Sequence, residues 1–288
     1  VSIHVALHHV THYQYDREVG FSRHILYLRP REDTLHRLRS YTLNVSPNAR
    51  LMPVRDPHDN TLTWAHFWDH ADALTIRTEF EIETLTQNPF DFILKPYAVK
   101  FPFAYEPVFD FALGPYLAQP FDETRQGLLA WLDTHFQNRP DETVPYLTQL
   151  CLLLYRTLAY ERREERGIQP SLTTLTRGSG ACRDFAVLFA ELCRSLGLAA
   201  RFVSGYFYAP ADDNHRSAGA MHAWVEVYLP GAGWEALDPT HGIWCDDAFI
   251  PVAHAAQAEA VNPIQGTFFD SGHATSKLHT NVVVEKLA

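Results

Sequence analysis

The sequence predicts an α+β protein, in which a β-sandwich-like N-terminal domain precedes a region of helices and then of strands. Residues 1–86 hold runs of alternating apolar and polar residues, such as VALHHVTHYQY and ALTIRTEFEIETL, separated by turn formers such as DPHDN. Several short runs at this spacing are typical of a β-sandwich. From about residue 121 apolar residues recur at helical spacing, and strand-like runs return after Gly197. We therefore divide the chain into an N-terminal β domain (1–86), a connecting segment (87–120) and an α+β core (121–288).

The connecting segment differs in composition from the regions on either side of it. Residues 88–120 contain six prolines and many aromatic residues. Such a segment is too apolar for a free linker, because it would leave a large apolar surface in water. We expect it to pack across the junction of the two regions and to line their contact. The aromatic residues expected there include Phe90, Phe92, Tyr97, Phe101 and Phe103.

Helices dominate the first half of the core, and strands dominate the second. Each expected helix has apolar residues at helical spacing, and Gly197 is suited to cap the last of them. The C-terminal run KLHTNVVVEKL predicts one more strand, which we assign to the core. The expected helices span 124–136, 143–160 and 182–196, and the expected strands span 199–208, 221–229, 234–240 and 277–287.

Composition and charge exclude several classes of function. The formal net charge of the 288 residues is −10, which argues against nucleic acid as a partner. Hydrophobic residues make up 46% and charged residues 20%, the profile of a globular protein with a sizeable core. Since no stretch of about 18 uninterrupted apolar residues occurs, we expect no membrane span. The amino-terminal run VSIHVALHHV is interpreted as a strand rather than a signal peptide.

The four cysteines, at positions 151, 182, 193 and 245, point to a reducing compartment. Cys182 and Cys193 are eleven residues apart on one expected helix. That separation is about 16 Å, too far for a disulfide. No Cys-x-x-Cys pair suggests a zinc or redox site, and no Asp-x-Asp-x-Asp-Gly loop suggests calcium. We therefore expect a cytoplasmic protein without a metal or another cofactor.

The run GSGACRDFAVLFAELCRSLG (178–197) places Cys182 at the start of an apolar helix, behind a flexible lead. The first amides of a helix lack intrahelical partners, and the helix dipole favours a negative charge there. A helix N-terminus and a neighbouring imidazolium can both lower the pKa of a thiol by several units. The same amides can bind the oxyanion of a tetrahedral intermediate. Cys182 is therefore a candidate nucleophile.

His222 and Asp238 are the candidate base and orienting residue, because His222 opens one expected strand and Asp238 closes the next. In a hairpin the open ends of the two strands meet, so the carboxylate can fix the tautomer of the imidazole. The run LPGA (229–232) suits a type II turn with Leu229 paired to Ala232. That register sets Asp238 one residue away from His222, so a direct contact requires a one-residue bulge or a diagonal approach.

Each of these residues also has a purely structural interpretation. Cys182 can be a core cysteine, His222 is one of 16 histidines, and Asp238 before a proline is a common turn opener. The three together, each in the local structure that its role needs, favour a thiol active site.

The runs around these residues resemble a known family. GSGACRDFAVLFAELCRSLGLAARFVSGY and MHAWVEVYLPGAGWEALDPTHG, with the spacing between them, resemble the bacterial transglutaminase-like superfamily. The runs THYQYDREV, LYLRPRE and DPHDN resemble the β-rich domain that precedes this core in one bacterial branch. The resemblance implies a papain-like core, with the nucleophile at a helix N-terminus that packs on an antiparallel sheet.

The resemblance also implies roles for individual residues. Cys182 would be the nucleophile, His222 the general base and acid, and Asp238 the orienting residue. Tyr160 falls where the family often has an aromatic residue, for which core packing is the preferred interpretation. Trp224 lies two residues past His222 on the same strand face, where it would wall the site or pack.

These roles imply a thiol acyl-transfer enzyme that acts on amide or isopeptide bonds of a peptide or protein substrate, such as a glutamine side chain. The superfamily contains cysteine peptidases, amidases and transglutaminases, so the acyl acceptor can be water or an amine. The alternative is a non-catalytic peptide-binding module that keeps the fold. The sequence leaves the oligomeric state open.

Overall fold

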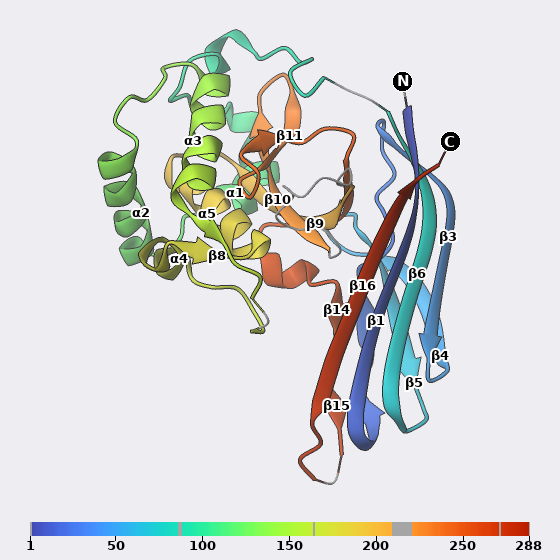
Figure 1. The fold of residues 1–288 in the computed structure, drawn as a ribbon. Helices are drawn as coiled ribbons and strands as arrows, with labels where there is room; N and C mark the ends of the chain where they lie inside the picture. Colours follow the sequence, from blue (N-terminus) through green and yellow to red (C-terminus); the bar gives the residue numbers. More distant parts are fainter. Residues whose placement is uncertain (1, 86–87, 164, 209–220, 271, 288) are drawn as a thin grey trace.

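The computed structural model describes residues 2–85, 88–163, 165–208, 221–270 and 272–287. A β-sandwich lies on one side and a helical region with its own sheet on the other (Figure 1). The predicted α+β class is confirmed. The predicted boundary at residues 86 and 87 lies outside the described residues, and the division into domains stays a prediction. Within the described part of the chain, no helix is both long and apolar enough to cross a bilayer.

The sandwich consists of two antiparallel sheets. One has the order β15-β1-β6-β3, with β16 also paired to β1, and the other has the order β14-β2-β5-β4. Their apolar faces enclose a core that includes Leu26, Ala65, Leu74 and Ile76. The strands are β1 (Ser2–Phe21), β2 (His24–Leu26), β3 (His36–Ser46), β4 (Ala49–Arg55), β5 (Thr61–Phe67), β6 (Ala71–Leu85), β14 (Ile264–Gln265), β15 (Phe268–Phe269) and β16 (Ser276–Lys286).

The C-terminal strand β16 belongs to this sandwich, which corrects its predicted place in the core. It pairs antiparallel with β1, from Val5 opposite Lys286 to Tyr15 opposite Ser276. Figure 1 shows β16 lying along β1, with the two chain ends close together. Without β16, the long edge of β1 would leave a row of backbone groups unpaired. The alternating pattern of residues 277–287 predicts a strand but does not specify its partner.

The remaining elements form the core around a sheet of order β12-β11-β10-β9-β13. Helix α5 packs on β10 and β9, and α2, α3 and α4 pack against it. The helices are α1 (Asp110–Leu117), α2 (Asp122–His135), α3 (Thr143–Thr157), α4 (Ser171–Arg177) and α5 (Cys182–Ser195), with short 3-10 turns at Pro96–Ala98, Pro107–Phe109 and Ala258–Val261. The strands are β7 (Ala159–Tyr160), β8 (Ser179–Gly180), β9 (Ala200–Phe207), β10 (His222–Leu229), β11 (Gly233–Asp238), β12 (Ile243–Trp244) and β13 (Phe249–Ala255).

The connecting segment packs on the core. The Phe101 ring lies 4.3 Å from that of Tyr146 on α3, measured between centroids. The Tyr105 hydroxyl donates to the Tyr228 carbonyl oxygen at 2.8 Å and accepts from the Ala199 N–H at 2.9 Å. The segment is therefore a packed part of the protein, as its composition predicts.

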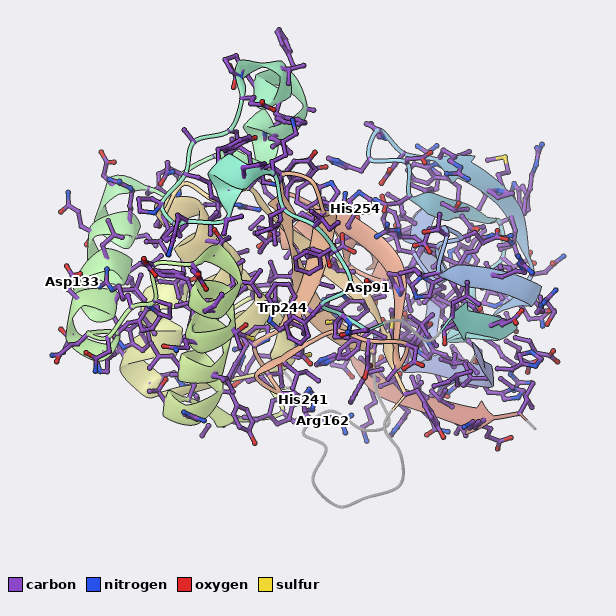
Figure 2. All side chains as sticks on the ribbon, turned by 90° about the horizontal axis from the view of Figure 1, so that it is seen from above. Asp91, Asp133, Arg162, His241, Trp244 and His254 are labelled. Carbon is purple, nitrogen blue, oxygen red and sulfur yellow. The ribbon has the colours of Figure 1, made fainter. Side chains whose placement is uncertain are left out.

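Polar residues outside the predicted aromatic set also join the sandwich to the core. The Asn60 side chain donates to the His254 carbonyl oxygen and accepts from the His254 N–H, both at 2.9 Å. The Arg31 N–H donates to the Pro251 carbonyl oxygen at 2.8 Å. These bonds attach the sandwich to β13, and His254 lies at this junction in Figure 2. The sandwich therefore supports the edge of the sheet that carries the candidate site.

Candidate active site

The hairpin of β10 and β11 closes with one residue more than the sequence predicts. The expected Pro-Gly turn forms, since the Ala232 N–H donates to the Leu229 carbonyl oxygen at 3.0 Å. Gly233 then adopts a φ of +99°, which favours glycine, and Leu229 pairs with Gly233. The predicted pairing of Leu229 with Ala232 is therefore wrong by one residue.

This extra residue decides which face of the sheet Asp238 occupies. Val225 pairs with Leu237, so Asp238 lies opposite Trp224 when the register is continued. Residues directly opposite each other share a face of a sheet, and so do residues two apart on one strand. Asp238 therefore shares a face with His222 and meets it diagonally. Asp238 Oδ2 and His222 Nε2 are 2.8 Å apart.

The His222–Asp238 pair is fully withdrawn from water, with both side chains 0% exposed. Burial alone would lower the pKa of His222. The Asp238 carboxylate, with smaller contributions from Cys182, more than offsets this and raises the pKa of His222 to about 10. Burial would conversely raise the pKa of Asp238, but His222 and His241 hold it well below its usual range. The pair is therefore an imidazolium and a carboxylate at neutral pH.

Cys182 is the first residue of α5, at the position that the sequence predicts. Its side chain is half-buried, and its proximity is one of the lesser causes of the raised pKa of His222. Because Asp238 engages Nε2, Nδ1 is the nitrogen of His222 that is left for the thiol. The structure thus brings together all three predicted site residues, in the order thiol, imidazole and carboxylate.

A second carboxylate, which the sequence analysis missed, holds the start of α5. Asp184 is fully buried and accepts from the Ala181 N–H at 2.9 Å and from the Gln169 N–H at 2.8 Å. Its third partner is Arg163, whose Nε lies 2.7 Å from Asp184 Oδ2. Arg183 donates from Nε to the Gly167 carbonyl oxygen at 2.9 Å. The two residues that follow Cys182 therefore bind Arg163, Gly167 and Gln169 to the helix N-terminus. Acidic residues at this helix position are a known capping signal.

Tyr160 and Trp224 surround the site in different ways. Tyr160 pairs with Gly180, two residues before Cys182, in the parallel strands β7 and β8. Burial, with a smaller effect of Cys182, raises the pKa of Tyr160 to about 12, so it stays a neutral phenol beside the thiol. Trp224 is 1% exposed, and its ring centroid lies 6.1 Å from that of His222. It therefore packs against the imidazole and is almost fully shielded from solvent.

His241, a further residue that the sequence analysis missed, also contacts Asp238. Its Nδ1 atom lies 2.6 Å from Asp238 Oδ2, the same oxygen that His222 engages. Figure 2 shows His241 on the same side of the core as Arg162. The ligand atoms of His222, Asp238 and His241 lie within 4.8 Å of one another, the spacing of a metal site. Since both nitrogens are at hydrogen-bond distance from the carboxylate, we assign the group as a hydrogen-bonded network.

Two family models match this chain. Residues 133–239 match the transglutaminase-like superfamily, and residues 5–83 match the bacterial transglutaminase-like N-terminal region. Together the two matches cover more than half of the chain. The chain belongs to the transglutaminase-like superfamily. Membership in this superfamily supports a thiol-dependent enzyme in general.

Two similar proteins align with nearly the whole transglutaminase-like chain, and a third aligns with part of it. An uncharacterized protein of Mycobacterium tuberculosis is 26% identical over 290 residues, covering 91% of this chain and 86% of that protein. An uncharacterized protein of Mycobacterium leprae is 31% identical over 119 residues, covering 41% of each chain. The crystal structure of a candidate cysteine protease from Cytophaga hutchinsonii superimposes with a TM-score of 0.76, at 18% identity, covering 100% of this chain and 92% of that one. This superposition shows that the two chains share a fold.

Cys182 should be the most reactive thiol of this transglutaminase-like chain. All four cysteines are unpaired, and burial raises the pKa of the Cys151, Cys193 and Cys245 thiols. We expect iodoacetamide at pH 6 to alkylate Cys182 roughly a hundred-fold faster than the other three, because thiolate character sets the rate. Peptide mapping by mass spectrometry of the native protein measures this. Faster labelling of any of the other three would contradict the assignment of Cys182 as nucleophile.

Proposed function

We propose that the chain is a cysteine acyl-transfer enzyme that cleaves amide or isopeptide bonds of a peptide or protein substrate. Cys182 is the nucleophile, His222 the general base and acid, and Asp238 the residue that orients His222. The observation that carries the proposal is the buried imidazole of His222, held by Asp238 on one nitrogen and left open to the Cys182 thiol on the other. The free cysteines suit a reducing, cytoplasmic environment, which is part of the proposal.

The proposed reaction has two halves. The Cys182 thiolate attacks the amide carbon, and backbone N–H groups at the start of α5 stabilise the oxyanion. The C–N bond then breaks as the His222 imidazolium gives its Nδ1 proton to the leaving nitrogen, which leaves a thioester on Cys182. In the second half, neutral His222 takes a proton from water or from an amine, which attacks the thioester and releases the acyl group.

The choice between water and an amine depends on which acceptor reaches the thioester. Hydrolysis makes the chain a peptidase or amidase, and transfer to an amine makes it a transglutaminase-type enzyme. The match to the transglutaminase-like family supports acyl transfer in general, and the similarity in fold to a candidate cysteine protease suits a peptide or protein substrate.

Trapping the acyl-enzyme tests this proposal. The full chain is incubated with a library of glutamine-containing and amide-linked peptides, quenched in acid and analysed by mass spectrometry. We expect an acyl adduct on Cys182 and on no other cysteine, with no adduct in the Cys182→Ala variant. Adding an excess of a primary amine, such as a biotinylated diamine, then shows whether the released acyl group carries the amine or a hydroxyl from water.

The same experiment distinguishes the non-catalytic alternative. A peptide-binding module would retain peptides without a covalent bond, and Cys182→Ala would bind them as well as the parent chain does. That result, with no adduct from any peptide, would overturn the proposed enzyme.

A further inference from the structure

The turn that follows β11 places a second imidazole on the carboxylate of the site. The Gly242 N–H donates to the Asp238 carbonyl oxygen at 2.8 Å and closes a turn over residues 238–242. Gly242 has a φ of +71°, and a side chain there would meet the Tyr155 ring at about 3 Å, so glycine is required on both counts. This turn brings His241 back onto Asp238.

The two oxygens of the Asp238 carboxylate accept hydrogen bonds from different donors. Oδ1 accepts from the Thr240 N–H at 2.8 Å, and Oδ2 accepts from His222 and from His241 at 2.8 and 2.6 Å. Because Asp238 is ionised, each imidazole nitrogen must act as the donor. Two donors that share one oxygen each draw on the same lone-pair density, so each bond is weaker than it would be alone.

Few charged groups in the described part of the chain surround His222, so the sharing of Asp238 Oδ2 affects how strongly its imidazolium is stabilised. Among the described residues, the other rings near it are apolar and come from three strands: Phe207 on β9, Trp224 on β10 and Phe249 on β13. Of the residues that the structure describes, the titratable groups that face it are the Cys182 thiol of α5, the Asp238 carboxylate of β11 and the imidazole of His241 in the next turn. The ring centroids of His222 and His241 are 5.4 Å apart. Cys151 and Cys245 also lie near Asp238, but burial keeps both thiols neutral.

We propose that His241 is a positioning residue that shares Asp238 Oδ2 with His222 and so limits how strongly the carboxylate stabilises the His222 imidazolium. This inference rests on the proposed function. If Asp238 Oδ2 accepted a hydrogen bond from His222 alone, the imidazolium would be a poorer acid. The transfer of its Nδ1 proton to the leaving nitrogen would then be slower. His241 weakens the hydrogen bond between His222 Nε2 and Asp238 Oδ2 while it keeps the carboxylate in place. His222 therefore remains acidic enough to complete the first half of the reaction.

A pair of variants separates hydrogen bonding from packing. His241→Asn keeps an N–H donor near the position of Nδ1 but removes the ring. His241→Phe keeps a ring of similar shape against Phe207, whose centroid is 5.0 Å from that of His241, but removes the donor. Sharing of the oxygen predicts that the asparagine variant resembles the parent and that the phenylalanine variant does not. A packing role predicts the reverse.

The first measurement needs no substrate. In the full chain labelled with 15N-histidine, the Nε2 proton of His222 is observed by NMR and assigned by its loss in His222→Gln. We expect this proton to move downfield in His241→Phe, because its bond to Oδ2 strengthens, and to stay near the parent position in His241→Asn. An unmoved or upfield-shifted proton in His241→Phe would overturn the proposal, whether or not the chain proves to be an enzyme.

The second measurement uses the pH dependence of kcat/KM on a peptide identified by acyl-enzyme trapping. The alkaline limb reports loss of the imidazolium proton, and we expect it to move up by roughly one pH unit in His241→Phe. The acidic limb should stay in place, while kcat falls. His241→Asn should restore the parental profile. A uniform fall in rate without movement of the alkaline limb would leave His241 a packing residue and overturn the proposal.

Discussion

Replacing His222 by alanine should lower kcat/KM by about a thousand-fold or more, the largest loss of activity expected from a single substitution near the thiol. The change removes the general base and acid, each of which is commonly worth about a hundred- to ten-thousand-fold. It also removes the imidazolium that, in the proposed mechanism, is the counter-charge of the attacking sulfur. The measurements are kcat/KM on a trapped peptide substrate and the rate of alkylation of Cys182 at pH 6. Both should fall together.

Asp238→Asn is the matched variant for this prediction. In the parent chain the carboxylate accepts hydrogen bonds from two imidazole N–H groups, which the asparagine amide would have to face instead. His222 then loses its orientation and its counter-ion. We expect a loss of roughly ten- to a thousand-fold, smaller than that of His222→Ala, since a cysteine thiolate forms more easily than an alkoxide. Because Asp238 is 0% exposed, the rates must refer to the folded fraction, which circular dichroism measures. Parental activity in Asp238→Asn, beside an inactive His222→Ala, would make Asp238 a turn residue.

Asp184→Ala should lower the free energy of unfolding by about 3–5 kcal/mol, the largest loss of stability expected from one substitution near the site. Asp184 is fully buried, and its removal leaves the Arg163 guanidinium, whose side chain is 9% exposed, without its buried carboxylate partner. It also leaves the N–H groups of Ala181 and Gln169 without an acceptor. Urea denaturation measures the change. Alkylation of Cys182 should also slow, because the start of α5 loses the hydrogen bonds and the ion pair that hold it in place.

Asp133→Ala is the control for this prediction, since it also removes an aspartate that pairs with an arginine. Asp133 lies at the outer edge of α2 in Figure 2, its side chain is 75% exposed, and its Oδ1 is 2.6 Å from Arg139 Nη2. Exposed pairs of this kind contribute about 0–1 kcal/mol, so we expect little change in stability. An equally small loss for Asp184→Ala would show that the buried pair does not hold the start of α5.

The local features of the site are encoded in short stretches of sequence. The Gly-Ser-Gly-Ala lead and the apolar run after it determine that a helix begins at Cys182. The runs that contain His222 and Asp238 determine two strands, and Pro230 with Gly231 determines the turn that joins them. Each of these features depends on residues within a few positions of one another, so periodicity and turn chemistry suffice to predict them.

What the sequence by itself determined is therefore the class of the fold, the elements that carry Cys182, His222 and Asp238, and the family. The tertiary structure decided which residues meet. The φ of Gly233 sets the register that turns Asp238 toward His222, and β16 pairs with β1 although more than 250 residues separate them. The Arg163–Asp184 ion pair likewise depends on how separate segments pack. A hydrophobic pattern specifies which face of an element is buried, but the partner of a strand edge or a buried charge is selected by the free energy of the whole packed chain.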